Sequence, residues 1–285
     1  LLSDFRQAAG LSEAQPVSTV ERMAKARKLK VKSVGQYRMS AVTAIAAKLD
    51  EIQADTGLDV KIHIDGASGA MIAPFCQPDL EWDFRVDRVV SINTSGHKYG
   101  LVYPGVGWIV WRDTDALPES MVFHCSYLGG DMPTLALNFS RPGAQVLLQY
   151  YVFLRLGRAG FTQVQQGSLD VAQWLSGQIA QIDGLELVSK GDTIPVFAWK
   201  LKAGHSENWN LYDLSDRLRM KGWLVPAYPM ADDLADLTVQ RIVVRAGLSH
   251  DLARALIADI RTEVDFLNRL ESPMPREGDG SHFHH

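Results

Sequence analysis

A lysine in a glycine-flanked loop is the residue of this 285-residue chain whose chemistry is easiest to name. Lys98 follows His97 and lies between Gly96 and Gly100, after a run of strand-forming residues. Glycines let a backbone approach a flat ligand closely, and Ser95 and His97 can donate hydrogen bonds to a phosphate. A lysine amine in such a loop can form a Schiff base with an aldehyde cofactor. An ordinary surface lysine in a turn has the same neighbours, so this alternative stays open.

A second candidate is Asp65, which ends the alternating run at residues 60–64 and precedes Gly66. In open α/β sheets, ligands bind at the carboxyl ends of the strands. A carboxylate there can keep a pyridine nitrogen protonated, as pyridoxal phosphate (PLP) requires when it accepts an electron pair. An aspartate that caps a turn before glycine produces the same pattern. Asp65 and Lys98 together therefore predict a PLP site, with the turn cap as the alternative.

The patterns around these loops predict an α/β fold with a mostly parallel sheet. Apolar residues at helical spacing predict a helix that starts after Ser40, as its N-cap, and ends at Thr56-Gly57. Alternating, β-branched runs predict strands at residues 60–64, 88–92 and 105–111. Residues 144–156 are apolar nearly all round, which predicts a helix buried between layers or between subunits.

The rest of the chain predicts a small α+β domain. Its expected helices are at residues 167–182, at 211–221 and from 249 onward, and its expected strands lie near 185, at 195–201, near 225 and at 239–244. We divide the chain into an unassigned segment (1–33), a cofactor-binding portion of a large domain (34–158), a small carboxyl-terminal domain (159–270) and a tail (271–285).

Composition favours a small-molecule partner. The formal charge of −4, from 29 basic and 33 acidic residues, gives no reason to expect nucleic acid or an anionic membrane as a partner. No apolar run approaches the ~20 residues that span a bilayer, and the first residues do not resemble a signal peptide. Only Cys76 and Cys125 are present, which suits a reducing cytoplasm. We expect a cytoplasmic protein with no metal site.

An ordered series of motifs resembles bacterial and plant glutamate decarboxylases from about residue 34 to the carboxyl terminus. The interval between Asp65 and Lys98 also suits that family. The motifs are His-Ile-Asp-Gly-Ala-Ser-Gly at 63–69, Ala-Pro-Phe at 73–75, Trp-Asp-Phe-Arg at 82–85, Ser-Ile-Asn-Thr-Ser-Gly-His-Lys-Tyr-Gly at 91–100, Tyr-Leu-Gly-Gly at 127–130 and Asn-Phe-Ser-Arg-Pro at 138–142.

The resemblance implies the carboxyl half of the large domain of a PLP-dependent, aspartate-aminotransferase-like (fold type I) enzyme, followed by a small α+β domain. It implies that Lys98 forms the Schiff base with PLP and that Asp65 bonds the pyridine nitrogen. Ala67 would pack near the ring, and Ser95 and His97 would contact the phosphate.

The same resemblance implies decarboxylation of L-glutamate to 4-aminobutyrate and carbon dioxide. Arg241 would hold the α-carboxylate of the substrate, and Lys98 or His97 would return a proton to the α-carbon. Without the resemblance, Arg241 reads as a strand residue in a surface ion pair. Ser140 would reach the phosphate held by a neighbouring subunit, so we expect a homodimer or a higher homo-oligomer with a shared site.

The chain departs from the family at its amino-terminal end, as a truncated or rearranged member would. Family members carry a longer stretch before the Asp-containing strand, with the first strands of the sheet, phosphate-binding residues, a side chain that stacks on the pyridine ring and the pocket for the distal carboxylate. Residues 1–33 show none of these features. An inactive homologue that acts as a binding or dimerisation partner is therefore an alternative, and decarboxylation of another amino acid, such as an aromatic one, is a second. The His-rich end at 281–285 resembles a family tail that can fold over the active site.

Overall fold

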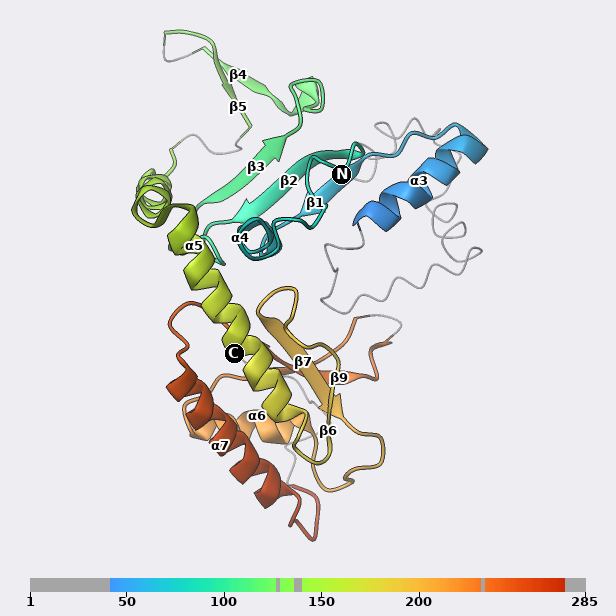
Figure 1. Cartoon of the computed structure of the whole chain (residues 1–285), viewed down its shortest axis with the longest axis vertical. Helices are drawn as coiled ribbons and strands as arrows, with labels where there is room; N and C mark the ends of the chain where they lie inside the picture. The colour runs from blue at the N-terminus through green and yellow to red at the C-terminus, as the bar shows by residue number, and fades with distance from the viewer. Residues whose placement is uncertain (1–41, 127–128, 136–139, 232–233, 275–285) are drawn as a thin grey trace.

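The computed structural model describes residues 42–126, 129–135, 140–231 and 234–274 (Figure 1). Several predictions fall outside these ranges. They concern residues 1–33, the N-cap at Ser40, parts of the motifs at 127–130 and 138–142, and the His-rich tail at 281–285.

A three-stranded sheet carries both candidate loops. Its central strand, β2 (Val89–Ser95), pairs in parallel with β1 (Ile62–Asp65) and antiparallel with β3 (Gly107–Trp111) (Figure 1). The three predicted strands are therefore confirmed, but only one of the two described pairings is parallel. The chain between β2 and β3 is too short for the crossover of a dozen or more residues that a parallel neighbour requires, so β3 returns antiparallel.

Helix α3 (Val42–Thr56) packs against this sheet. Its buried residues Val42 and Ala46 join a core cluster that includes Val89 of β2. The helix ends where the sequence predicts, because Gly57 follows it with a φ of 75°, a backbone conformation that glycine adopts at little cost. Arg88, which is 7% exposed, precedes β2 and forms an ion pair with Asp50 of α3. This ion pair links the helix to the start of β2.

Short elements follow the strands of the first sheet. A turn of 3-10 helix, η2 (Gly69–Met71), and the short helix α4 (Ala73–Cys76) come after β1. After β3, a 3-10 turn, η3 (Glu119–Met121), leads into the hairpin of β4 (Phe123–Cys125) and β5 (Met132–Thr134). The hairpin extends away from the body of the chain at the top of Figure 1.

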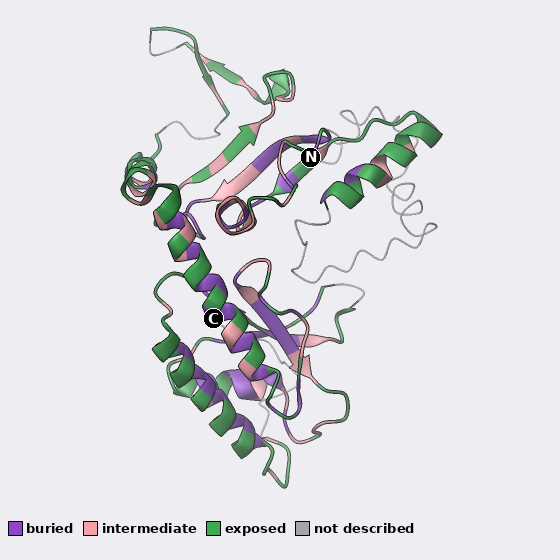
Figure 2. Ribbon diagram, viewed as in Figure 1, coloured by how far each residue is buried: buried purple, intermediate pink, exposed green. Residues whose placement is uncertain are grey.

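The long helix α5 (Ala144–Ile179) connects the two halves of the structure and has a non-helical residue, Gly157, at φ 56°. Its first part is exposed, with Leu147 at 70% and Leu154 at 68% relative accessibility (Figure 2). The prediction of burial between layers is therefore wrong for the described chain, because no described element covers these side chains. Burial between subunits stays a prediction, as does the domain boundary at 158/159.

The second half of the structure contains an antiparallel sheet with the strand order β6-β7-β9-β8. Two helices and the buried second part of α5 pack with it around one apolar core. These elements confirm the predicted α+β arrangement, although β8 lies slightly later than expected. Their bounds are β6 (Leu185–Leu187), β7 (Val196–Leu201), α6 (Leu211–Met220), β8 (Ala227–Pro229), β9 (Thr238–Val243) and α7 (His250–Leu267).

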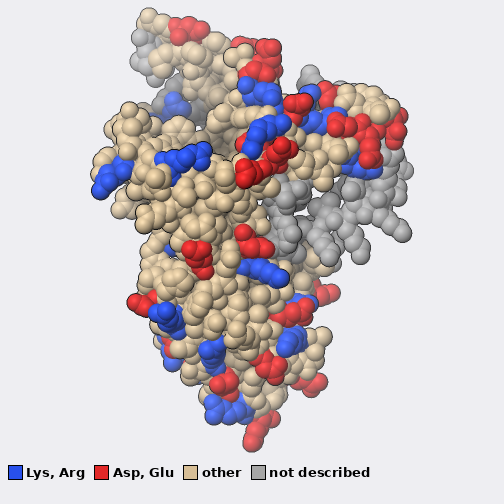
Figure 3. All heavy atoms as spheres, in the orientation of Figure 1, with Lys and Arg blue, Asp and Glu red and all other residues tan. Residues whose placement is uncertain are grey.

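The helix starts in this half follow ordinary capping chemistry. Asn210 and Asp213 form a reciprocal capping box at α6, and the Ser249 side chain accepts a hydrogen bond from the Leu252 amide at the start of α7. Within the described ranges, no helix has both the length and the apolar character that crossing a membrane demands. Acidic and basic side chains are interspersed on the visible face of the molecule (Figure 3).

Candidate active site

Parallel pairing of β1 and β2 brings the two candidate loops to one edge of the sheet. Asp65 lies opposite Asn93 in the register of the pair. Just beyond, the Ser95 amide donates to the Ala67 carbonyl at 3.1 Å, and the Lys98 amide donates to the Ser95 carbonyl at 3.3 Å. Asp65, Ala67, Ser95 and Lys98 are thus brought together as the sequence predicts.

Gly66 makes this close approach possible. A Cβ atom at this position would lie 2.6 Å from the carbonyl oxygen of Asn93 and 2.7 Å from the Cβ of Ala70. The Gly66 amide also donates to the Asn93 side-chain oxygen at 2.8 Å. The glycine of this motif therefore lets the end of β1 lie against β2.

The Asp65 side chain caps the turn that follows it. Its Oδ1 accepts a hydrogen bond from the Ala67 amide at 3.1 Å, so the turn-capping alternative is present in the structure. This contact occupies one of the two carboxylate oxygens, and Asp65 is exposed. The cap therefore leaves room for a second role of the same side chain towards a ligand.

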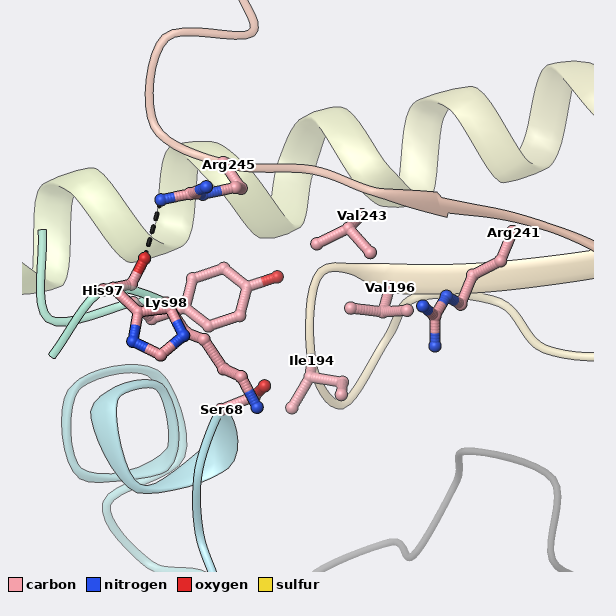
Figure 4. A pocket seen from close by; sticks show the side chains of 9 residues that line it. Ser68, His97, Lys98, Ile194, Val196, Arg241, Val243 and Arg245 are labelled. Atoms are coloured by element: carbon pink, nitrogen blue, oxygen red, sulfur yellow. Dashed lines mark hydrogen bonds between the residues drawn. The ribbon is translucent and has the colours of Figure 1, made fainter. Parts of the chain in front are cut away.

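A pocket of about 390 Å³ lies between the Lys98 loop and the antiparallel sheet (Figure 4). It brings together three predicted catalytic residues: Lys98, His97 and Arg241. Asp65, Ala67 and Ser95 lie at the neighbouring sheet edge and do not line it. The lining residues are Ser68, His97, Lys98, Tyr99, Ile194, Val196, Arg241, Val243 and Arg245.

Arg241 enters the pocket from β9, and its guanidinium carbon lies 5.4 Å from the centre of the Tyr228 ring. Such stacking suits the planar guanidinium group.

Ser140 is described and exposed just before α5, but it does not line the pocket. Its predicted contact with a neighbouring subunit is not tested by a single chain.

Side chains from other elements hold the Lys98 loop. Gln165, fully buried in α5, donates to the Tyr99 carbonyl at 2.7 Å. Gln149, also fully buried in α5, donates to the Gly100 carbonyl at 2.8 Å.

Burial raises the pKa of the Tyr99 hydroxyl well above its usual range, although the guanidinium groups of Arg245 and Arg241 act in the opposite direction.

Sequence reasoning missed six lining residues: Ser68, Tyr99, Ile194, Val196, Val243 and Arg245. Ser68 and Tyr99 lie inside motifs that resemble the family, so their positions in those loops were a usable signal. Alternation along β9 could have placed Val243 and Arg245 on the same face as Arg241. Nothing in the local pattern pairs Ile194 or Val196 with the Lys98 loop, because their proximity depends on how the two sheets pack.

The donor set at this edge fits PLP. The cofactor carries an aldehyde, a pyridine nitrogen and a phosphate. The chain presents an amine (Lys98), a carboxylate (Asp65) and hydroxyl and imidazole groups (Ser95, Ser68, His97) beside two hydrogen-bonded strand ends. Among the described residues, no group of three or more His, Cys, Asp and Glu side chains is arranged to hold a metal ion.

The fold and this donor set together indicate a PLP-binding chain of fold type I. The family model described as the pyridoxal-dependent decarboxylase conserved domain matches residues 30–202, more than half of the chain. The chain therefore belongs to the pyridoxal-dependent decarboxylase family, and this membership indicates PLP as its cofactor.

Three of the relatives that match this chain are named glutamate decarboxylases. The chain is 51% identical over 226 residues to a glutamate decarboxylase of Aliivibrio fischeri, a match that covers 79% of this chain and 49% of the relative. It is 46% identical over 231 residues to glutamate decarboxylase beta of Listeria monocytogenes, covering 81% and 50%. A solved glutamate decarboxylase from Lactobacillus brevis superposes with a TM-score of 0.75 at 44% identity, covering 81% of this chain and 52% of that one. These matches confirm the resemblance to glutamate decarboxylases, and the chain spans about half the length of the curated relatives it matches.

Proposed function

We propose that this chain carries the lysine-bearing part of a PLP site that decarboxylates L-glutamate to 4-aminobutyrate and carbon dioxide. The observation that carries the proposal is the shared pocket of Lys98, His97 and Arg241, although Arg241 comes from a distant strand. The names of the relatives, all glutamate decarboxylases at 45–51% identity, supply the substrate and the reaction.

In this proposal, the residues at the strand ends hold and polarise the cofactor. Bound PLP supplies an electron sink for the pair left behind when carbon dioxide departs. Asp65 would keep a proton on the pyridine nitrogen, and Ala67 would pack near the ring. Ser95 and His97 would donate hydrogen bonds to the phosphate, and the Lys98 amine would hold the cofactor at its aldehyde carbon.

The pocket residues orient the substrate. The planar fork of Arg241 suits a bidentate contact with the α-carboxylate of glutamate. Both Lys98 and His97 line the pocket, and either can return a proton to the α-carbon through Nζ or a ring nitrogen.

The proposal includes a homodimer or a higher homo-oligomer with a shared site. Exposed apolar side chains along the first part of α5 support it, because large apolar patches on monomers mark interaction surfaces. Ser140 lies shortly before that helix, which begins at Ala144, and is exposed, as a residue that reaches a neighbour's phosphate must be. A cytoplasmic location agrees with the thiols of Cys76 and Cys125, which are not joined in a disulfide.

A second candidate is an inactive binding or dimerisation partner, favoured by the exposed apolar side chains along the first part of α5. Release of 4-aminobutyrate from glutamate by the chain with added PLP separates the two functions, with aromatic amino acids as a substrate panel. We expect glutamate turnover that Lys98→Ala abolishes and a KM for glutamate that Arg241→Met raises at least about tenfold. Arg254→Met, which removes an exposed arginine from α7, should change neither. If the chain turns over no amino acid and still self-associates, the inactive-partner function holds.

A further inference from the structure

The carbonyl group just before Lys98 is held by an arginine from the other sheet. Arg245 Nη2 donates to the carbonyl oxygen of His97 at 2.7 Å (Figure 4). Arg245 lies just beyond the end of β9, on the same segment as Arg241. The chemistry proposed above gives Arg245 no task.

We infer that Arg245 is a positioning residue for Lys98, an inference that rests on the proposed function of that lysine. The peptide unit between His97 and Lys98 is planar, so its carbonyl oxygen and the Cα atom of Lys98 lie in one plane. The hydrogen bond to this oxygen, together with the one from the Lys98 amide to the Ser95 carbonyl, therefore restrains the plane and narrows the directions in which the Lys98 side chain can leave the backbone.

The neighbouring carbonyls of the loop already have anchors on α5. Gln165 donates to Tyr99 and Gln149 donates to Gly100. These contacts fix the loop after Lys98, whereas the contact from Arg245 fixes it before Lys98. Because the donor is charged, this hydrogen bond is stronger than one between neutral groups.

Arg245 also connects the Lys98 loop to the segment that carries Arg241, the residue proposed to hold the substrate. Along this segment, Arg241, Val243 and Arg245 are exposed and alternate with the buried residues Ile242 and Val244. The exposed side chains therefore share one face, which lines the pocket. One continuous segment, β9 and the two residues after it, thus carries both the proposed carboxylate contact and the anchor of the Lys98 loop, so the separation between amine and carboxylate depends on this segment.

A direct contact between Arg245 and the substrate is the competing role. It predicts that loss of the guanidinium weakens glutamate binding and leaves the loop and its lysine unaffected. The positioning role predicts changes in the loop before any amino acid is added.

Two variants and a matched control separate these roles in the full chain. Arg245→Met removes the donor and keeps the apolar stem, and Arg245→Lys keeps one donor. Arg158→Met is the control, because Arg158 Nη1 likewise donates to a carbonyl, that of Pro74, at 2.7 Å. We measure amide hydrogen exchange of residues 96–102 without PLP, the rate at which PLP modifies Lys98, and the midpoint of unfolding in urea.

In Arg245→Met we expect exchange of this segment to be about tenfold faster and modification of Lys98 about tenfold slower, the size of one charge-assisted hydrogen bond at an exposed site. Arg245→Lys should recover most of both effects, and Arg158→Met should show neither at a similar unfolding midpoint. Unchanged exchange in Arg245→Met overturns the inference, as does normal modification of Lys98 with weaker glutamate binding. If PLP does not modify Lys98 in the unaltered chain, the proposed function fails, and the exchange result still decides the role of Arg245.

Discussion

The hydroxyl of Tyr99 donates a hydrogen bond to the carbonyl of Val244 at 3.2 Å. Tyr99 follows Lys98 in the sequence and is 2% exposed. Val244, the first residue after β9, is fully buried. This contact joins the Lys98 loop to the antiparallel sheet. The pocket therefore depends on the packing of the two sheets as well as on the loops that line it.

Replacing Tyr99 with phenylalanine should lower the free energy of unfolding by about 1 kcal/mol, because the ring remains and one intramolecular hydrogen bond is lost. Urea denaturation measures this change. Tyr103→Phe is the control, since that side chain is 73% exposed and its replacement should leave the midpoint unchanged. Equal effects of the two substitutions would contradict the assigned role of Tyr99.

The same tyrosine should contribute to loss of stability at high pH. Burial raises the pKa of Tyr99 in the folded chain above its ordinary value of 10.0. Above pH 10 the unfolded chain releases this proton while the folded chain keeps it, so the free energy of unfolding falls as the pH rises towards the folded pKa. The difference in stability between the unaltered chain and Tyr99→Phe should therefore shrink above pH 10. A constant difference between pH 8 and pH 11 would show that Tyr99 does not titrate in this way.

Gly66→Ala should displace the ends of β1 and β2, because the new methyl group would lie within 2.7 Å of both the Asn93 carbonyl oxygen and the Ala70 Cβ. We expect a loss of about 1–3 kcal/mol in stability, typical of overpacking, together with weaker PLP binding. Gly167→Ala is the matched control, at an exposed position in the second part of α5 where a Cβ meets no atom within 4 Å. It should stabilise the chain by about 0.5–1 kcal/mol. Thermal unfolding and titration with PLP test both variants, and a neutral Gly66→Ala would refute the close approach.

Gln165→Met should destabilise the Lys98 loop, because it leaves the Tyr99 carbonyl without its side-chain donor. The expected loss is about 1 kcal/mol, near the low end for such a change, since the substitution also removes the Gln165 side-chain oxygen, which is buried without a partner. The adjacent Gln166 is exposed, and Gln166→Met should be nearly neutral. If urea denaturation finds the two variants equally stable, the α5 anchor does not support the loop.

The exposed face of α5 should mediate self-association. Leu147 and Leu154 are 70% and 68% exposed, so a charge at either position would be tolerated in a monomer and costly in a buried interface. Sedimentation velocity should show a dimer or larger species for the unaltered chain and a monomer for Leu147→Glu with Leu154→Glu. Met220→Glu, at a side chain 74% exposed on α6, is the control. Unchanged sedimentation of the double variant would exclude this face as the interface.

Most of the fold could be predicted from local patterns. Helix α7 begins after Ser249 and β9 covers nearly the predicted residues, because capping groups and alternation are local properties. The direction of β3 and the exposure of Leu147 were not predictable in the same way. The first depends on where β2 ends and β3 begins, because the connection between them is close to the shortest parallel crossover. The second depends on what else packs against an apolar helix.

In the site, too, local features could be predicted and tertiary contacts could not. Asp65 and Lys98 could be paired from sequence, because both follow strands whose carboxyl ends meet at one edge. The contact of Arg245 with His97 could not be predicted, because it joins the loop after β2 to the segment after β9. Only tertiary packing brings such residues together.

Reduction of the PLP adduct tests the central claim most directly. The purified chain is mixed with PLP, treated with borohydride and digested, and the modified peptides are mapped by mass spectrometry, with Lys98→Arg as the control. We predict that the pyridoxyl group lies mainly on Lys98 and that the Lys98→Arg variant loses this label. Labelling that is spread over surface lysines, or that is unchanged in the variant, would contradict the assignment of Lys98 as the cofactor lysine.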